Sequence, residues 1–191
     1  MLILPLLLAA LVGEGGEPPP ALRAGALRGE IRIDGRLSEP GWLNAEAISD
    51  LTMIEPVSGG PPTGRTEVRV LASEREIVIG VRCFDPDPGR IVAFTKERDG
   101  DFEGEDHLLF VIDPFQDGRS GYVFSVNPGG ARFDGLVVSN GDDVDQNWDG
   151  VWEAAAERDE QGWSAEIRIP VLSINFAKGL SSWGFNVERR I

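Results

Sequence analysis

Tryptophan side chains are the first residues in this chain whose type and spacing suggest chemistry. Four of the five tryptophans fall between Asn147 and Trp183. An indole ring can fill a core, but it can also stack on a sugar ring, whose axial C–H bonds form an apolar face that matches a flat aromatic. Trp148 lies in the segment 141–150, which is polar and has turn residues at both ends and no strand period. Two hypotheses for Trp148 therefore stand side by side, stacking on a sugar and packing beneath its own loop.

The residues near Trp148 divide between the same two roles. Asn147 and Arg98 carry amide and guanidinium groups that could orient sugar hydroxyls beside a stacking ring. Trp152 opens a strand pattern that continues with Ala154 and Ala156, which favours the core and leaves ligand contact as the alternative. Trp163 and Trp183 fall in the apolar register of alternating segments, so we expect both of them in the core.

Acidic clusters raise the question of a metal. Residues 99–104 begin like a calcium loop, but the twelfth position is Phe110 where an EF-hand needs a bidentate glutamate, so that site is excluded. Asp142, Asp143 and Asp145 crowd one loop and could share a structural Ca²⁺; solvated turn carboxylates are the alternative. We expect no cofactor to be required.

Catalytic patterns are weak. His107 is the single histidine, and no G-x-S-x-G elbow accompanies it, so it is predicted to be an ordinary strand residue. One histidine also excludes a His-rich zinc site. A glycosidase needs two carboxyl groups at a set separation, and with 32 acidic residues the sequence cannot single out a pair. Cys83 is the only cysteine, which excludes an intrachain disulfide and predicts a buried, inert thiol.

Length and charge limit the partners. A chain of 191 residues fits one domain. Its formal net charge is −14, and nucleic acids and anionic membranes need a basic face, so we expect neither as a partner. Residues 1–24 contain an apolar run with the length of a signal-peptide hydrophobic region, then a Gly- and Pro-rich linker. We therefore expect export, to the periplasm, the outside of the cell or the outer membrane, and a folded module over residues 25–191.

Alternating segments between Asx-Gly turns predict an all-β, antiparallel, jelly-roll-like sandwich with one or two short helices. One helix is predicted between Ser38 and Ala47, with Ser38 as its cap and Trp42 packed against the sheet. The predicted strands are 30–33, 51–54, 66–71, 76–84, 107–113, 122–127, 131–139, 151–158, 162–169 and 183–190.

The order of several segments resembles a known family. Asp34, Gly35, Glu39 and Trp42 resemble the opening DG-x-x-x-E-x-x-W signature of the family 9 carbohydrate-binding modules. The likeness continues in residues 66–71, 76–81, 106–113 and 162–170, and it covers about residues 30–191. Residues 122–130, 147–152 and 183–191 are also similar to the amino-terminal module of large bacterial surface proteins, where a domain thought to form an outer-membrane barrel follows.

This resemblance implies a non-catalytic module that binds polysaccharide ends, of xylan or β-glucan, in carbohydrate catabolism. It implies an attached glycoside hydrolase or a downstream barrel as the partner. In such modules two aromatic rings clamp a terminal sugar. Trp148 with Asn147 would supply one half, and Phe84, Phe94, Phe102 and Tyr122 are candidates for the second ring. The alternatives are an interaction domain that binds no sugar and a small glycoside hydrolase.

Overall fold

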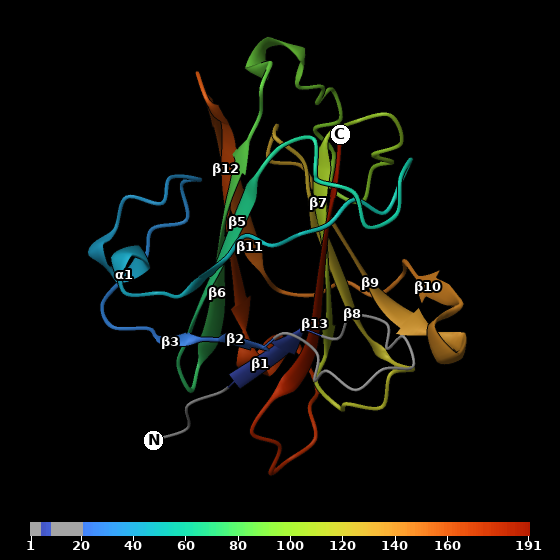
Figure 1. The fold of residues 1–191 in the computed structure, drawn as a ribbon. Coiled ribbons are helices and arrows are strands. Elements are labelled where there is room, and N and C mark those ends of the chain that lie inside the picture. Colours follow the sequence, from blue (N-terminus) through green and yellow to red (C-terminus); the bar gives the residue numbers. More distant parts are fainter. Residues whose placement is uncertain (1–4, 9–20) are drawn as a thin grey trace.

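Two β-sheets face each other and enclose one core in the computed structural model of this chain, which describes residues 5–8 and 21–191 (Figure 1). Sheet A has the spatial order β10 (Asp143–Asp145), β9 (Arg132–Val138), β8 (Gly121–Val126), β7 (His107–Asp113), β13 (Trp183–Arg190), β1 (Pro5–Leu8) and β2 (Ala21–Arg23). Sheet B has the order β11 (Glu153–Asp159), β12 (Gly162–Pro170), β6 (Glu76–Phe84), β5 (Thr66–Ala72) and β3 (Gly25–Ala26), and β4 (Ala47–Ile48) also pairs with β5.

Helical structure is short. It consists of α1 (Pro40–Leu43) and of the 3₁₀ turns η1 (Pro88–Arg90), η2 (Ser139–Gly141) and η3 (Val171–Ser173). Within the described residues, none of the helices combines the length and the hydropathy that a membrane span would need. The predicted all-β sandwich is confirmed. Its sheets are antiparallel except for two parallel pairs, β1 with β13 and β3 with β5.

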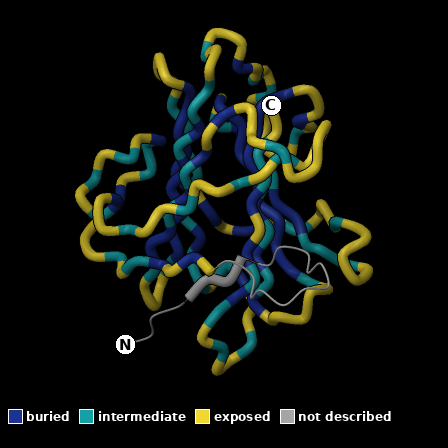
Figure 2. The backbone as a smooth tube through the Cα atoms, in the orientation of Figure 1, coloured by how far each residue is buried: buried dark blue, intermediate teal, exposed yellow. Residues whose placement is uncertain are grey.

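The core lies between the sheets because alternate side chains along the strands point inward. Figure 2 shows buried residues along the strands of both sheets. Trp163 is fully buried there and Trp183 nearly so, which confirms both predictions. Cys83 is also buried, as predicted. Burial raises the pKa of its thiol to about 12, which keeps it protonated and unreactive.

Most predicted strands match within a few residues, but two of them are absent. Residues 30–33 and 51–54 run as irregular chain. Ile31 is buried against Trp42 without a strand beside it, so its apolar character reflects packing and not pairing. Met53 exchanges backbone hydrogen bonds with Gly59 and Gly60, which closes a local loop.

Two predictions at the level of single residues were also wrong. The segment 141–150, predicted to have no strand, contains β10, and its Val144 pairs with Val137 of β9. Helix α1 begins after Glu39, not Ser38, and it has no side-chain cap. Trp42 on this helix is nevertheless packed against sheet B as expected.

The amino-terminal prediction concerns residues that are only partly described. Residues 1–4 and 9–20 of the predicted leader and linker lie outside the described residues. Pro5–Leu8 pairs with β13, and β2 contributes the buried Leu22 to the core. Removal of a leader within residues 1–24 stays a prediction.

Candidate functional site

Two of the predicted site residues, Arg98 and Trp152, meet at the buried carboxylate of Asp134. This carboxylate is 0% exposed and points inward from β9. It accepts hydrogen bonds from Trp152 Nε1 at 2.9 Å, from the backbone N–H of Gly150 at 2.7 Å and from Arg98 Nη2 at 2.7 Å. Burial disfavours the charged guanidinium of Arg98, but Asp134 outweighs this, with help from two exposed aspartates, and the pKa of Arg98 is raised. The three side chains therefore form an internal cross-link that holds the 147–152 segment against sheet A.

Aromatic packing accounts for Trp148 and for Tyr122. The Trp148 ring is half-buried, with its centroid 4.9 Å from that of Tyr122 and 6.0 Å from that of Phe124. Tyr122 is 4% exposed, and its hydroxyl accepts a hydrogen bond from the backbone N–H of Asn175. Trp152 is likewise 4% exposed. The Trp148 ring thus packs beneath its own loop, and Tyr122 and Trp152 are buried. Ligand contact by any of these three residues stays a prediction.

Asn147 and the acidic residues before it form a local turn. The side-chain amide of Asn147 donates to Asp145 Oδ1 at 2.8 Å, and its backbone N–H donates to the same oxygen at 3.0 Å. These bonds lower the pKa of the exposed Asp145. Among the residues that the structure describes, no three histidine, cysteine or acidic side chains are grouped closely enough to hold a metal. A calcium ion at Asp142, Asp143 and Asp145 stays a prediction.

A hollow with a volume of about 830 Å³ lies on the outer face of sheet A. Its floor is built by neighbouring strands, because Leu109 of β7 pairs with Ser125 of β8, which pairs with Phe133 of β9. Arg190 of β13 and Gln146 of the segment after β10 complete it. The other lining residues come from the 99–105 loop, the start of β7 and the last residue: Asp99, Gly100, Asp101, Phe102, Glu103, Gly104, Glu105, His107 and Ile191.

Phe133 is the aromatic ring most accessible in this hollow. Its side chain is half-buried, and it belongs to neither hydrophobic core cluster of the described residues. Strand β9 turns Asp134 toward the core, so its neighbour Phe133 must face outward. A half-exposed ring on a rigid strand is a platform on which a sugar could stack.

The 99–105 loop forms a fixed wall beside this floor. The backbone N–H of Asp99 donates to the carbonyl of Arg132 at 2.8 Å. The buried Glu105 carboxylate accepts hydrogen bonds from the N–H groups of Phe94 and Thr95 and from the Asn127 amide. Burial acts to raise the pKa of Glu105, but these hydrogen bonds outweigh it and the pKa is lowered. The wall is thus held in place by the chain's own contacts.

Two residues considered in the sequence analysis line the same hollow. Phe102, one of the candidate second rings, is buried with its centroid 5.7 Å from the His107 ring. His107, predicted to be an ordinary strand residue, is 7% exposed at the edge of the hollow. Phe133 was missed altogether, because the sequence alone does not say which face of β9 points inward.

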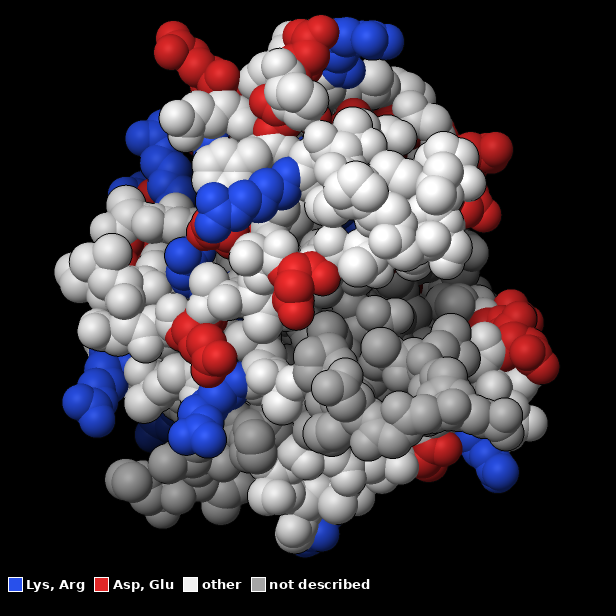
Figure 3. All heavy atoms as spheres, in the orientation of Figure 1, with Lys and Arg blue, Asp and Glu red and all other residues white. Residues whose placement is uncertain are grey.

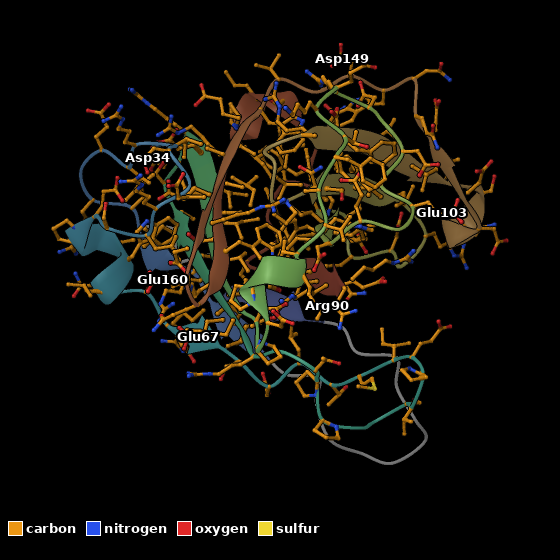
Figure 4. The ribbon with its side chains drawn as sticks, turned by 90° about the horizontal axis from the view of Figure 1, so that it is seen from above. Asp34, Glu67, Arg90, Glu103, Asp149 and Glu160 are labelled. Atoms are coloured by element: carbon orange, nitrogen blue, oxygen red, sulfur yellow. The ribbon has the colours of Figure 1, made fainter. Side chains whose placement is uncertain are left out.

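The signature residues lie on the opposite side of the sandwich and have a structural role. Glu166 of β12 is 0% exposed on the outer face of sheet B. Its carboxylate accepts hydrogen bonds from the N–H groups of Asp34 and Gly35 and from Trp42 Nε1. Gly35 has a φ of 85°, and a β-carbon there would lie 2.6 Å from the Ala156 backbone. Figure 4 shows Asp34 and Glu103 on opposite sides of the molecule.

Comparisons with known proteins support the fold. No family model matches the sequence, and no curated protein matches it. A solved structure of a family 9 carbohydrate-binding module from Caldicellulosiruptor kristjanssonii, in complex with cellotriose, is similar with a TM-score of 0.53 and 12% identity, covering 87% of this chain and 82% of the other. A putative carbohydrate-binding protein from Bacteroides uniformis is similar with a TM-score of 0.51 and 14% identity, covering 77% of each chain.

These likenesses define the class of fold. At such low identities they establish the arrangement of the strands and nothing of the ligand. The protein is a β-sandwich with a fold like that of a family 9 carbohydrate-binding module.

Proposed function

We propose that this protein is a non-catalytic carbohydrate-binding module and that it binds oligosaccharide in the hollow over β7, β8 and β9. The observation that carries the proposal is Phe133, a half-buried aromatic ring on a floor of paired strands, beside a wall that the chain holds in place. Stacking on such a ring contributes on the order of 1 kcal/mol beyond the area it buries.

The class of glycan and the context of the module are part of the same proposal. Ends of β-linked glucan or xylan are the ligands we expect, as the resemblance in the sequence implied, and a similar fold has been solved with cellotriose. An attached hydrolase or a downstream barrel would give such binding its purpose by keeping a partner near polysaccharide. Export of the protein belongs to this proposal as well.

Calorimetric titration of the protein with cellotriose and xylobiose tests the proposal. We expect saturable heat for the unchanged chain and a loss of affinity of about tenfold or more in Phe133→Ala, because the variant removes the stacking platform. Since Phe133 lies outside the core, the free energy of unfolding of Phe133→Ala should differ from that of the unchanged chain by less than about 1 kcal/mol.

Phe94→Ala is the matched control. Phe94 is 66% exposed and does not line the hollow, so the variant removes the same ring without touching the floor. It should bind like the unchanged chain. Absence of heat with every sugar would contradict the proposal and favour the interaction domain. Equal affinities of the two variants would place any binding outside this hollow.

A further inference from the structure

Two buried polar side chains that line the hollow, His107 and Ser125, offer hydrogen-bond acceptors to a ligand. The Nδ1 atom of His107 lies 2.9 Å from the backbone oxygen of Glu105, and a carbonyl oxygen can only accept. The proton of neutral His107 must therefore sit on Nδ1, which leaves a lone pair on Nε2, and no residue in the described part of the chain bonds to Nε2. The hydroxyl of Ser125 donates to the carbonyl of Leu108 at 2.7 Å, so Ser125 Oγ also has only lone pairs left for a ligand.

The wall of the hollow adds negative charge to this floor. Asp99, Asp101 and Glu103 line it. The backbone N–H of Glu103 donates to Asp101 Oδ1, and within the described residues the Glu103 carboxylate has no hydrogen-bond or ion-pair partner. Arg190, a cation that also lines the hollow, forms an ion pair through its Nε with Glu188 at 2.6 Å. In the space-filling view acidic side chains gather along the edge of the molecule on the side of β10, whereas basic ones lie more on the side of α1 and β6 (Figure 3).

We propose that this hollow prefers sugars that carry a protonated amine, such as a non-acetylated glucosamine residue, over neutral hexoses, and that it rejects uronic acids. The inference rests on the function proposed above and names its ligand class. An ammonium group brings three donors and no acceptor, which matches His107 Nε2, Ser125 Oγ and the carboxylates of the wall. A uronate brings acceptors and a negative charge to a site already rich in both.

Three β-1,4-linked trisaccharides separate the outcomes. The glucosamine trimer differs from cellotriose by an amine in place of one hydroxyl on each ring, and the glucuronate trimer differs from it by a carboxylate in place of the hydroxymethyl group on each ring. In calorimetric titrations of the whole chain at low salt, we expect the glucosamine trimer to bind about fivefold tighter than cellotriose and the glucuronate trimer to give no heat. The preference should shrink at high salt, because ions screen exposed charges.

A pair of variants separates local recognition from general attraction to an acidic protein. Glu103→Gln should reduce the ratio of the affinity for the glucosamine trimer to the affinity for cellotriose. Glu160→Gln removes the same charge from a turn on the far side of the molecule (Figure 4) and should leave the preference unchanged.

The results also separate this inference from the proposal beneath it. Equal or weaker binding of the glucosamine trimer, with cellotriose bound, would overturn the inference alone. An equal loss of preference in both variants would overturn it too. Absence of binding by all three sugars would overturn the proposed function as well.

Discussion

The outer faces of both sheets carry hydrogen-bond acceptors, but the chain covers the acceptor on sheet B and leaves a hollow on sheet A. On sheet B, the carboxylate of Glu166 is covered by the 31–42 segment, which supplies three donors to it. On sheet A, His107 and Ser125 line a hollow of about 830 Å³. A buried acceptor whose partners come from its own chain stabilises the fold, whereas an acceptor left facing a hollow is available to a ligand.

The comparison also separates family likeness from ligand recognition. The most recognisable residues of the chain, Asp34, Gly35 and Trp42, serve the closed face. Gly80 lies beside Glu166 in the register and has no side chain, which lets the Trp42 ring lie on the sheet; a β-carbon there would be 2.8 Å from the ring. A motif can thus identify the fold through its packing and carry no information about the ligand.

The largest effect we expect is a loss of stability when the Glu166 carboxylate is removed from the outer face of sheet B. Glu166→Ala leaves the backbone N–H groups of Asp34 and Gly35 and the Trp42 indole without an acceptor, and should lower the free energy of unfolding by about 3 kcal/mol. Urea denaturation measures this change. Ser164→Ala, which removes one hydrogen bond to the Gly35 carbonyl on the same face, should cost only about 1 kcal/mol. Similar losses in the two variants would mean that the Glu166 network does not hold the cover in place.

A smaller effect on stability tests whether the binding site stops at the hollow. Trp148→Ala removes a half-buried ring from its contacts with Tyr122 and Phe124, and should lower the unfolding free energy by about 2 kcal/mol. The other hypothesis for Trp148, stacking on a sugar, expects the reverse, a loss of binding with stability nearly unchanged. Cellotriose affinity equal to that of the unchanged chain is the expected calorimetric result. Lost affinity with full stability would move the ligand to the Trp148 loop.

Sequence patterns predicted the sandwich because the period of two in a strand is a local property. Strands β6, β7 and β13 coincide with their predicted bounds, and Trp163 and Trp183 lie in the core as expected. The pattern fails where a polar residue is buried. In β9, Asp134 points into the core because it gains donors from Arg98, Gly150 and Trp152, which are distant in sequence.

The position of the candidate site depends on this buried aspartate. With Asp134 inside, Phe133 is turned outside, and the stacking candidate becomes a residue that a binary reading would bury. The place of His107 in the lining of the hollow also depends on tertiary structure, because the 99–105 loop packs against its ring through Phe102. Both positions depend on hydrogen bonds between residues distant in sequence, and the two-residue period of a strand carries no information about such bonds.

The smallest effect is a difference in pH dependence between the two buried glutamates. Burial raises the pKa of Glu166 above its ordinary value of 4.5, with Asp34, Gly35 and Trp42 only partly opposing it. Its contribution to stability is therefore fully present below that value and is lost as the pH rises through the raised pKa. Glu105 behaves in the opposite sense, because its pKa is lowered; its contribution is present above 4.5 and is lost as the pH falls.

Urea unfolding of Glu166→Gln and Glu105→Gln across a pH series measures this contrast. As the pH rises from the acid side, the free energy of unfolding of Glu166→Gln should increase relative to that of the unchanged chain, because the variant removes a charge whose burial opposes folding. Glu105→Gln should become less favourable over the same range, since it removes a carboxylate that its donors stabilise. If the unfolding free energies of the two variants changed with pH in parallel, the outer faces of sheets A and B would not differ in how they stabilise a buried carboxylate. The two faces would then differ only in shape, one covered by the chain and the other hollow.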